Sequence, residues 1–333
     1  MSRITLFILF LLINGHAVFS QANMRLGFGS CNNSNANQAY WQVIDAEKLY
    51  SWIWLGDIVY ADSKKSKKIR KKYNDLKSNE YYKTFDQHNL IYGIWDDHDY
   101  GANDGGVDFK AKRKSRDILF DFLELPDDHD AWSRPAAYQT HELRQGELTV
   151  QLILLDVRYY RDKLKSDINS ASRYKADEKA KMLGEEQWQW LAISLKESEA
   201  DLIIIGSGTQ VIPLEQVYEK WADYPTERLR LINLIKQHTN KKILLFSGDR
   251  HMAEVSAIDL EDNYTLFEIT SSGLTHSWTR PGEETNSHRI GRMYPQKNYG
   301  TLEIFKNGTE INVTGNIHAI DGTILKEYPI FPQ

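Results

Sequence analysis

The stretch from Ile91 to Asp104 places several acidic side chains and one imidazole directly after an apolar run. Ile91-Tyr-Gly-Ile94 predicts a buried strand, and Trp95 leads from it into Asp-Asp-His-Asp at positions 96–99. Carboxylates this close repel one another when they are buried, unless a cation lies among them. We therefore expect a divalent or trivalent metal ion here. A solvated acidic turn is the alternative that this stretch alone leaves open.

Other apolar runs also end on groups that can bind a metal ion or a phosphate. They lead to Cys31 and Asn32 after 26–30, Asp57 and Tyr60 after 52–55, Asp156 and Arg158 after 150–155, Gln210 after 201–205, and Asp249 and His251 after 242–247. The carboxyl ends of parallel strands meet at one edge of a sheet, so these side chains are expected to lie close together.

Each of these residues also has an ordinary structural interpretation. Asp57 could cap a turn beside a packed Tyr60, and Cys31 and His251 could be a buried thiol and a core histidine. Arg158 could form a salt bridge with a neighbouring acid instead of clamping a phosphate.

The elements that position these residues alternate between strands and helices. Helices are expected over 38–50, 110–123, 183–198 and 226–238, between the strands given above. From about residue 257, short segments at 266–270, 300–305 and 310–314 are separated by glycine turns and predict antiparallel strands. The pattern indicates a layered α/β fold, and nothing in it divides residues 21–333 into two domains.

The two segments at 61–89 and 133–144 are expected to be loops that flank the cleft. The first contains Lys64 to Lys72, in which seven of nine residues are basic. This run is either a solvated helix face or a lid that attracts an anionic substrate.

Residues 1–20 have the features of a secretory signal peptide. Arg3 precedes the apolar run Ile4–Ile13, and small residues precede Gln21. The apolar run is about half of what a membrane span needs, and an uncleaved anchor is the alternative. We expect a secreted or periplasmic protein that has no transmembrane segment.

The mature chain is mildly acidic and carries a single cysteine. Of 41 basic and 46 acidic residues, the signal peptide removes only Arg3, which leaves 40 against 46 and a net charge of −6. Nucleic acid is therefore not expected as a stable partner. Cys31 cannot form an intramolecular disulfide, so another role is expected for it in an oxidising compartment. The sequence does not determine the oligomeric state; a monomer is our working expectation.

Taken together and in order, the motifs resemble those of the calcineurin-like metallophosphoesterases, and among them the alkaline phosphatase D (PhoD-like) family. They cover most of residues 25–280: Gly29-Ser-Cys31, Gly56-Asp57-x-x-Tyr60-Ala-Asp62, Trp95-Asp-Asp-His-Asp99, Asp156-x-Arg158, Leu183-Gly-x-x-Gln187 and Gly248-Asp-x-His251. The resemblance implies a four-layer αββα sandwich of two mixed β-sheets flanked by helices, with a dinuclear metal centre between the sheets.

The resemblance also implies the metal ligands, which are Cys31, Asp57, Tyr60, Asp97, Asp249 and His251, with Asn32 and Gln210 as further candidates. Asp57 matches the bridging carboxylate. Cys31 and Tyr60 suit Fe³⁺, whereas the oxygen ligands suit a hard cation such as Ca²⁺, with Mn²⁺, Mg²⁺ or Zn²⁺ as alternatives. Asp97 and Asp249 stand where most of the wider superfamily has Asn and His.

The implied activity is that of a secreted, metal-dependent phosphoric ester hydrolase, an alkaline phosphatase or phosphodiesterase. Two metal ions would activate water for attack on phosphorus, with Asp57, His98 and Arg158 as the catalytic candidates. One alternative is a narrow phosphodiesterase or phospholipase D-like enzyme acting on a cell-wall, lipid or nucleotide diester. A different class of alternative is a catalytically silent protein that binds phosphate or metal.

Overall fold

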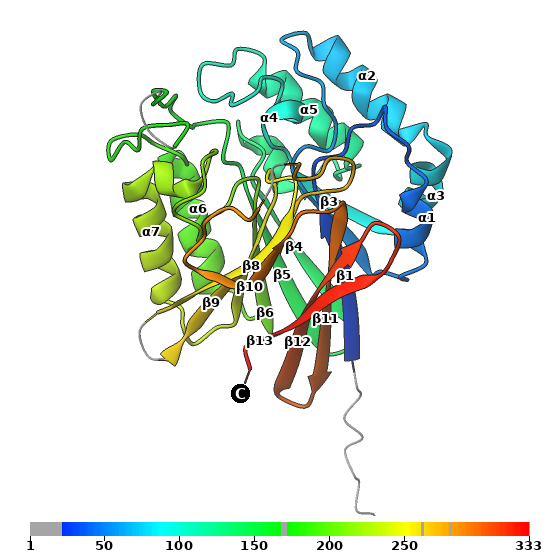
Figure 1. Cartoon of the computed structure of the whole chain (residues 1–333), viewed down its shortest axis with the longest axis vertical. Coiled ribbons are helices and arrows are strands. Elements are labelled where there is room, and N and C mark those ends of the chain that lie inside the picture. Colours follow the sequence, from blue (N-terminus) through cyan, green and yellow to red (C-terminus); the bar gives the residue numbers. More distant parts are fainter. Residues whose placement is uncertain (1–21, 168–171, 261–262, 280–281, 333) are drawn as a thin grey trace, which may run out of the picture.

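The computed structural model describes residues 22–167, 172–260, 263–279 and 282–332. These residues form two β-sheets with helices on their outer faces, as Figure 1 shows. The predicted signal peptide, residues 1–20, lies outside the described residues. The division of the chain into a signal peptide and one following domain therefore stays a prediction. Within the described part, no helix combines the length and the apolar character that a bilayer span requires.

The first sheet has six strands in the order β13-β12-β11-β1-β2-β3. β1, β2 and β3 are parallel, whereas β11, β12 and β13 pair antiparallel beside β1. The bounds are Ala22–Gly29 for β1, Ser51–Leu55 for β2, Leu90–Ile94 for β3, Asn298–Asn307 for β11, Glu310–Ala319 for β12 and Ile324–Ile330 for β13.

The second sheet has seven strands in the order β10-β8-β9-β7-β6-β5-β4. Its centre, from β5 through β6 and β7 to β9, is parallel, and β4, β8 and β10 are antiparallel to their neighbours. The bounds are Gln139–Gln145 for β4, Leu148–Leu155 for β5, Leu202–Ser207 for β6, Ile243–Ser247 for β7, Ala253–Asp259 for β8, Thr265–Ser271 for β9 and Arg289–Tyr294 for β10.

The helices form the two outer layers (Figure 1). α6 and α7 cover the second sheet, and α1, α2, α3 and α5 lie on the side of the first. The bounds are Tyr40–Asp45 for α1, Ser66–Lys77 for α2, Glu80–His88 for α3, Asp97–Tyr100 for α4, Lys112–Phe122 for α5, Glu185–Glu197 for α6 and Pro225–Lys236 for α7, with short 3₁₀ turns at Asp130–Ser133 and Trp221–Asp223.

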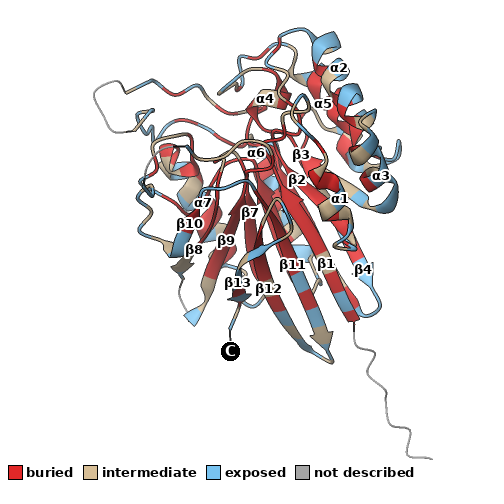
Figure 2. Ribbon diagram, turned by 45° about the vertical axis from the view of Figure 1, so that its right-hand side comes forward, coloured by how far each residue is buried: buried red, intermediate tan, exposed pale blue. Residues whose placement is uncertain are grey.

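The core follows from the two-residue period of the central strands, which are buried on both faces (Figure 2). In β6, Ile203 and Ile205 pack with α6 and α7, whereas Leu202 and Ile204 belong to the cluster between the sheets. Phe28 of β1 stacks on Phe246 of β7 with ring centroids 4.0 Å apart, so the two sheets are in direct contact. The predicted sandwich of two mixed sheets flanked by helices is thus confirmed.

The structure corrects the prediction that residues 61–89 and 133–144 are loops. Helices α2 and α3 make up much of the first segment, and the second half of the second segment belongs to β4. The basic run of 64–72 falls largely on α2, which buries Ile69, Tyr73 and Leu76 and exposes most of its lysines. This arrangement agrees with a solvated helix face. The helix expected over 38–50 is also shorter, at Tyr40–Asp45.

Candidate metal centre

The predicted ligand residues lie at the carboxyl ends of β1, β2, β3 and β7, at the upper edge of the sheets in Figure 1. Four of them have left-handed backbone conformations: φ is 61° at Cys31, 49° at Asp57, 69° at Asp249 and 55° at His251. Such conformations cost about 1–3 kcal/mol each outside glycine and tend to occur at functional sites. They turn the chain sharply where each strand ends.

Glycines at these turns allow the strand ends to approach one another. Gly56 has φ 88°, and a Cβ there would collide with the Cβ of Asp96. A Cβ on Gly248 would collide with the carbonyl oxygen of Leu55. The glycine of each Gly-Asp motif is therefore required for Asp57 and Asp249 to reach the same place.

The first group of ligand atoms contains a thiol, a carboxylate, a phenol and an imidazole. The Sγ of Cys31 lies 3.5 Å from Oδ2 of Asp57, and the Oη of Tyr60 lies 3.2 Å from the same oxygen. Tyr60 Oη is also 3.2 Å from Nε2 of His251. One ligand atom each from Cys31, Asp57 and His251 falls within 4.8 Å of the others, which is close enough to surround one ion.

A second group of acids adjoins the first. Asp97 forms such a cluster with Asp57 and His98, and another with Asp96 and Asp249. One oxygen of Asp97, Oδ2, accepts the backbone N–H of Asp104 at 2.7 Å, whereas Oδ1 is buried and has no hydrogen-bond partner among the described residues. A buried carboxylate oxygen without a partner is costly, and a cation would satisfy it.

The electrostatics of the two groups also favour bound cations. Burial, and then the charges of neighbouring acids, raise the pKa of Asp57 and of Asp249 well above the usual range. Burial followed by the charge of Asp57 does the same to the pKa of the Cys31 thiol. Burial lowers the pKa of His251 to about 4, which keeps its imidazole neutral and able to act as a ligand. The residues present therefore fit metal ions.

His98 faces the cleft and is oriented by an acid that sequence reasoning had not given a role. Its Nδ1 lies 2.8 Å from Oδ1 of Asp62, and its ring packs on Tyr60 with centroids 4.1 Å apart. Burial lowers the pKa of His98, but the hydrogen bond to Asp62 and the charges of Asp57 and Asp97 outweigh it and raise the pKa to about 10.

Arg158 does not lie where a phosphate clamp would. Its side chain is 0% exposed, and its guanidinium binds both oxygens of Asp96 and one of Glu219. This guanidinium has no access to solvent, and its N–H donors already bind carboxylates, so it is not available to bind a substrate phosphate. The geometry speaks against the clamp and favours the salt bridge with neighbouring acids that the sequence left open.

Asn32 and Gln210 are engaged elsewhere. The amide oxygen of Asn32 accepts hydrogen bonds from Gln38 at 2.9 Å and Tyr40 at 2.8 Å, and its nitrogen donates to the carbonyl of Ile58. The amide nitrogen of Gln210 donates to Glu254 and Thr270. These contacts speak against Asn32 as a metal ligand. The Oε1 of Gln210 is buried and has no hydrogen-bond partner among the described residues, so Gln210 stays a candidate.

A cleft of about 220 Å³ opens beside the acids. It is lined by Asp97, His98, Asn103, Asp104, Arg173, Tyr218, Glu219, Asp249, Arg250, His251, Ser277, Trp278 and Thr279. Glu219 and Arg173 belong to none of the sequence motifs, so the sequence did not predict that they line the cleft. His276 packs against Tyr60 and His251 with centroid distances of 4.6 and 4.9 Å, and the residues that follow it, Ser277 to Thr279, line the cleft.

The fold and these clusters define a two-sheet α/β sandwich with a candidate metal centre at one edge. The family model of the PhoD-like phosphatases matches residues 26–317, and the chain belongs to this family.

One curated relative and two solved structures are similar to this chain. Alkaline phosphatase D of Bacillus subtilis (strain 168) is 30% identical over 134 residues, which cover 36% of this chain and 22% of the relative, about a fifth of its length. The solved structure of PhoD superposes with a TM-score of 0.66 at 18% identity, covering 94% of this chain and 72% of that one. GAP50, the anchor in the inner membrane complex of Plasmodium, superposes with a TM-score of 0.58 at 14% identity, covering 93% and 89%. At these identities the two structures support the fold alone.

Proposed function

We propose that this protein is a metal-dependent phosphoric ester hydrolase that works outside the cytoplasm after cleavage of a signal peptide. The observation that carries the proposal is the convergence of buried acids, a thiol, a phenol and an imidazole on one cleft, with Oδ1 of Asp97 left without a partner among the described residues. Membership of the PhoD-like phosphatase family supports the same activity.

The donor set favours two different ions. Cys31, Tyr60 and His251 would hold an iron ion together with Asp57, because thiolate and phenolate suit Fe³⁺. Asp57, Asp97 and Asp249 would hold a harder ion such as Ca²⁺ through oxygen atoms. The ions would neutralise the charge of a phosphate group and lower the pKa of a water molecule.

The remaining residues would bind the substrate and move protons. His98, held by Asp62, is the candidate that donates a proton to the leaving oxygen, because it lines the cleft and its Nδ1 lies 2.8 Å from Oδ1 of Asp62. Arg173 replaces Arg158 as the candidate for binding phosphate charge. It lines the cleft, its side chain is 45% exposed, and it forms one ion pair, of 2.9 Å, with Asp104.

The test compares hydrolysis of p-nitrophenyl phosphate and bis(p-nitrophenyl) phosphate by the chain from Gln21 onward. We expect activity on at least one of them, its loss on chelation, and its recovery with iron and calcium. Asp57→Asn should lose metal, measured by elemental analysis, and nearly all turnover. Asp75→Asn is the matched control, because Asp75 is an exposed acid on α2 that pairs with Lys71 at the surface. A protein that binds metal but hydrolyses neither ester would favour the silent binding protein.

A further inference from the structure

A second and larger cavity adjoins the cleft. It measures about 700 Å³ and is lined by Lys64, Ala102, Asn103, Asp104, Gly105, Asp108, Phe109, Lys110, Ala111, Arg161, Lys163, Leu164, Ser166, Tyr174 and Glu219. Asn103, Asp104 and Glu219 line both hollows. The cleft and the cavity are therefore neighbours that share these three side chains.

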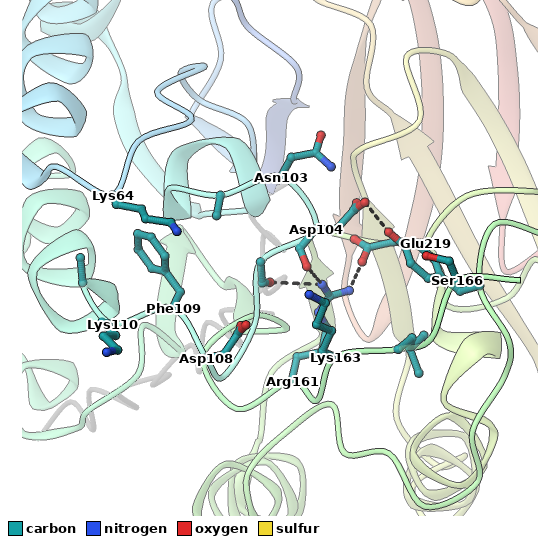
Figure 3. A pocket seen from close by; sticks show the side chains of 15 residues that line it. Lys64, Asn103, Asp104, Asp108, Phe109, Lys110, Arg161, Lys163, Ser166 and Glu219 are labelled. Atoms are coloured by element: carbon teal, nitrogen blue, oxygen red, sulfur yellow. Dashed lines mark hydrogen bonds and ion pairs between the residues drawn. The ribbon is translucent and has the colours of Figure 1, made fainter. Parts of the chain in front are cut away.

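The wall between the two hollows is held by buried ion pairs. Arg161 binds Glu219 and the backbone carbonyls of Asp104 and Gly105, as the dashed lines in Figure 3 show. The backbone N–H of Asp104 in turn donates to Asp97. The shared wall of the cavity is thus tied by hydrogen bonds to a candidate metal ligand.

The lining combines apolar surface with positive charge. Phe109 and Leu164 are 6% and 8% exposed and form apolar wall together with Ala102. Three exposed lysines, Lys64, Lys110 and Lys163, also line it.

The three lysine amines have no charged partner among the residues that the structure describes. No hydrogen bond or ion pair joins their amines to another described residue, whereas Arg161, Glu219 and Asp104 are paired with one another or with Arg173. Asp108 is one opposing acid in the lining. The cavity therefore has an excess of unpaired positive charge.

We propose that this cavity binds the alcohol portion of the phosphate ester, and that it selects alcohols with a flat apolar body and an anionic group. The inference rests on the proposed function, since it takes the cleft as the place where the phosphorus is held. The apolar wall accommodates the body, and the lysines bind the anion through charge-assisted hydrogen bonds. The anion is either a carboxylate or a second phosphate.

The test measures binding by isothermal titration calorimetry, independently of turnover, with para-substituted benzylphosphonates. The three substituents are a neutral carboxamide, a carboxylate of similar size, and a phosphonomethyl group. We expect an anionic ligand to bind the metal-loaded protein roughly tenfold more tightly than the carboxamide, the size of one charge-assisted hydrogen bond. Whichever anion binds more tightly identifies the chemistry of the natural alcohol.

Two sets of variants assign the preference to the cavity. In the triple variant Lys64→Ala, Lys110→Ala, Lys163→Ala, the ratio between anionic and neutral ligands should fall to within about twofold, because the charged hydrogen bonds are lost. The matched control removes the same charge from Lys65, Lys67 and Lys68, which are exposed and do not line the cavity. It should keep the ratio. Ala111→Phe should weaken all three benzylphosphonates relative to inorganic phosphate by filling the cavity.

The outcomes separate this inference from the proposed function. Equal affinities for neutral and anionic ligands, or an equal loss of preference in both triple variants, would overturn the cavity assignment while hydrolysis of p-nitrophenyl esters still supported the hydrolase. A protein that binds neither inorganic phosphate nor any benzylphosphonate, and hydrolyses nothing, would overturn both.

Discussion

The guanidinium of Arg158 binds both carboxylate oxygens of Asp96, with Nε 2.6 Å from Oδ1 and Nη2 2.8 Å from Oδ2, and both side chains are fully buried. Asp96 immediately precedes Asp97 and caps the single helical turn of α4. This geometry favours a role for Arg158 in holding the acid-rich turn in place, and the same guanidinium also pairs with Glu219.

Replacing Arg158 should destabilise the protein strongly. Arg158→Met leaves Asp96 buried without its cation and leaves Glu219 with Arg161 alone, and we expect the free energy of unfolding to fall by about 3–5 kcal/mol in urea titrations. Arg230→Met is the control, because Arg230 also binds a carboxylate with two donors, on Glu185, but at the surface. Its loss should cost at most about 1 kcal/mol. Similar losses in the two variants would contradict the positioning role.

Iron bound by Cys31 and Tyr60 should colour the protein. Phenolate and thiolate ligands give ligand-to-metal charge transfer with Fe³⁺, so the purified protein should absorb visible light. Tyr60→Phe and Cys31→Ser should each shift or abolish the band. Tyr92→Phe should keep it, because Tyr92 packs on His141 of β4. A colourless wild-type protein that holds stoichiometric zinc would remove iron from the assignment.

His98 should matter most for esters with poor leaving groups. If His98 protonates the leaving oxygen, His98→Asn should reduce kcat for an alkyl ester by about 10²–10⁴-fold. The loss should be much smaller for p-nitrophenyl esters, whose leaving group needs no proton. Asp62→Asn should give a weaker form of the same pattern, because Asp62 orients the ring. An equal loss with both leaving groups would instead indicate a role in binding.

The stability of the fold should fall on acidification, partly through His141. Burial, and then the nearby His129, lower the pKa of His141 from 6.5 to about 3. Below about pH 6.5 the imidazole of His141 is protonated in the unfolded chain but stays neutral in the folded protein, and this difference favours unfolding. The contribution of His141 to the free energy of unfolding is therefore fully present above pH 6.5 and is lost as the pH falls toward 3.

Urea titrations at pH 7 and pH 4.5 measure the effect of His141. His141→Gln should lose less stability than the wild type between these pH values, and its side chain can still donate to Gln139 as the ring nitrogen does at 2.8 Å. Identical losses in the two proteins would show that His141 does not contribute.

The sequence predicted the strands that carry the site because each is an apolar run that ends on a polar group. It did not predict α3, whose nine residues bury only Tyr82 and Phe85, or β4, which exposes several polar side chains. Elements with so little apolar surface leave a weak periodic signal, and their packing against neighbours decides their structure.

The candidate site was predictable where a residue follows a strand directly, as do Cys31, Asp57, Asp97 and Asp249. It was not predictable where a partner comes from elsewhere in the chain. Nothing local indicates that Glu219 meets Arg158, because the two are brought together by folding alone. Asn32 is a different case, because its amide oxygen accepts hydrogen bonds from Gln38 and Tyr40, which are close to it in the sequence.

The candidate ligands span the chain from Cys31 to His251 and follow strands of both sheets. No short segment of the polypeptide contains all the ligands of either proposed metal ion. An incompletely folded chain would therefore bind these ions weakly. The ions would be acquired where the last strands dock, and the compartment in which folding is completed would decide which metals this protein carries.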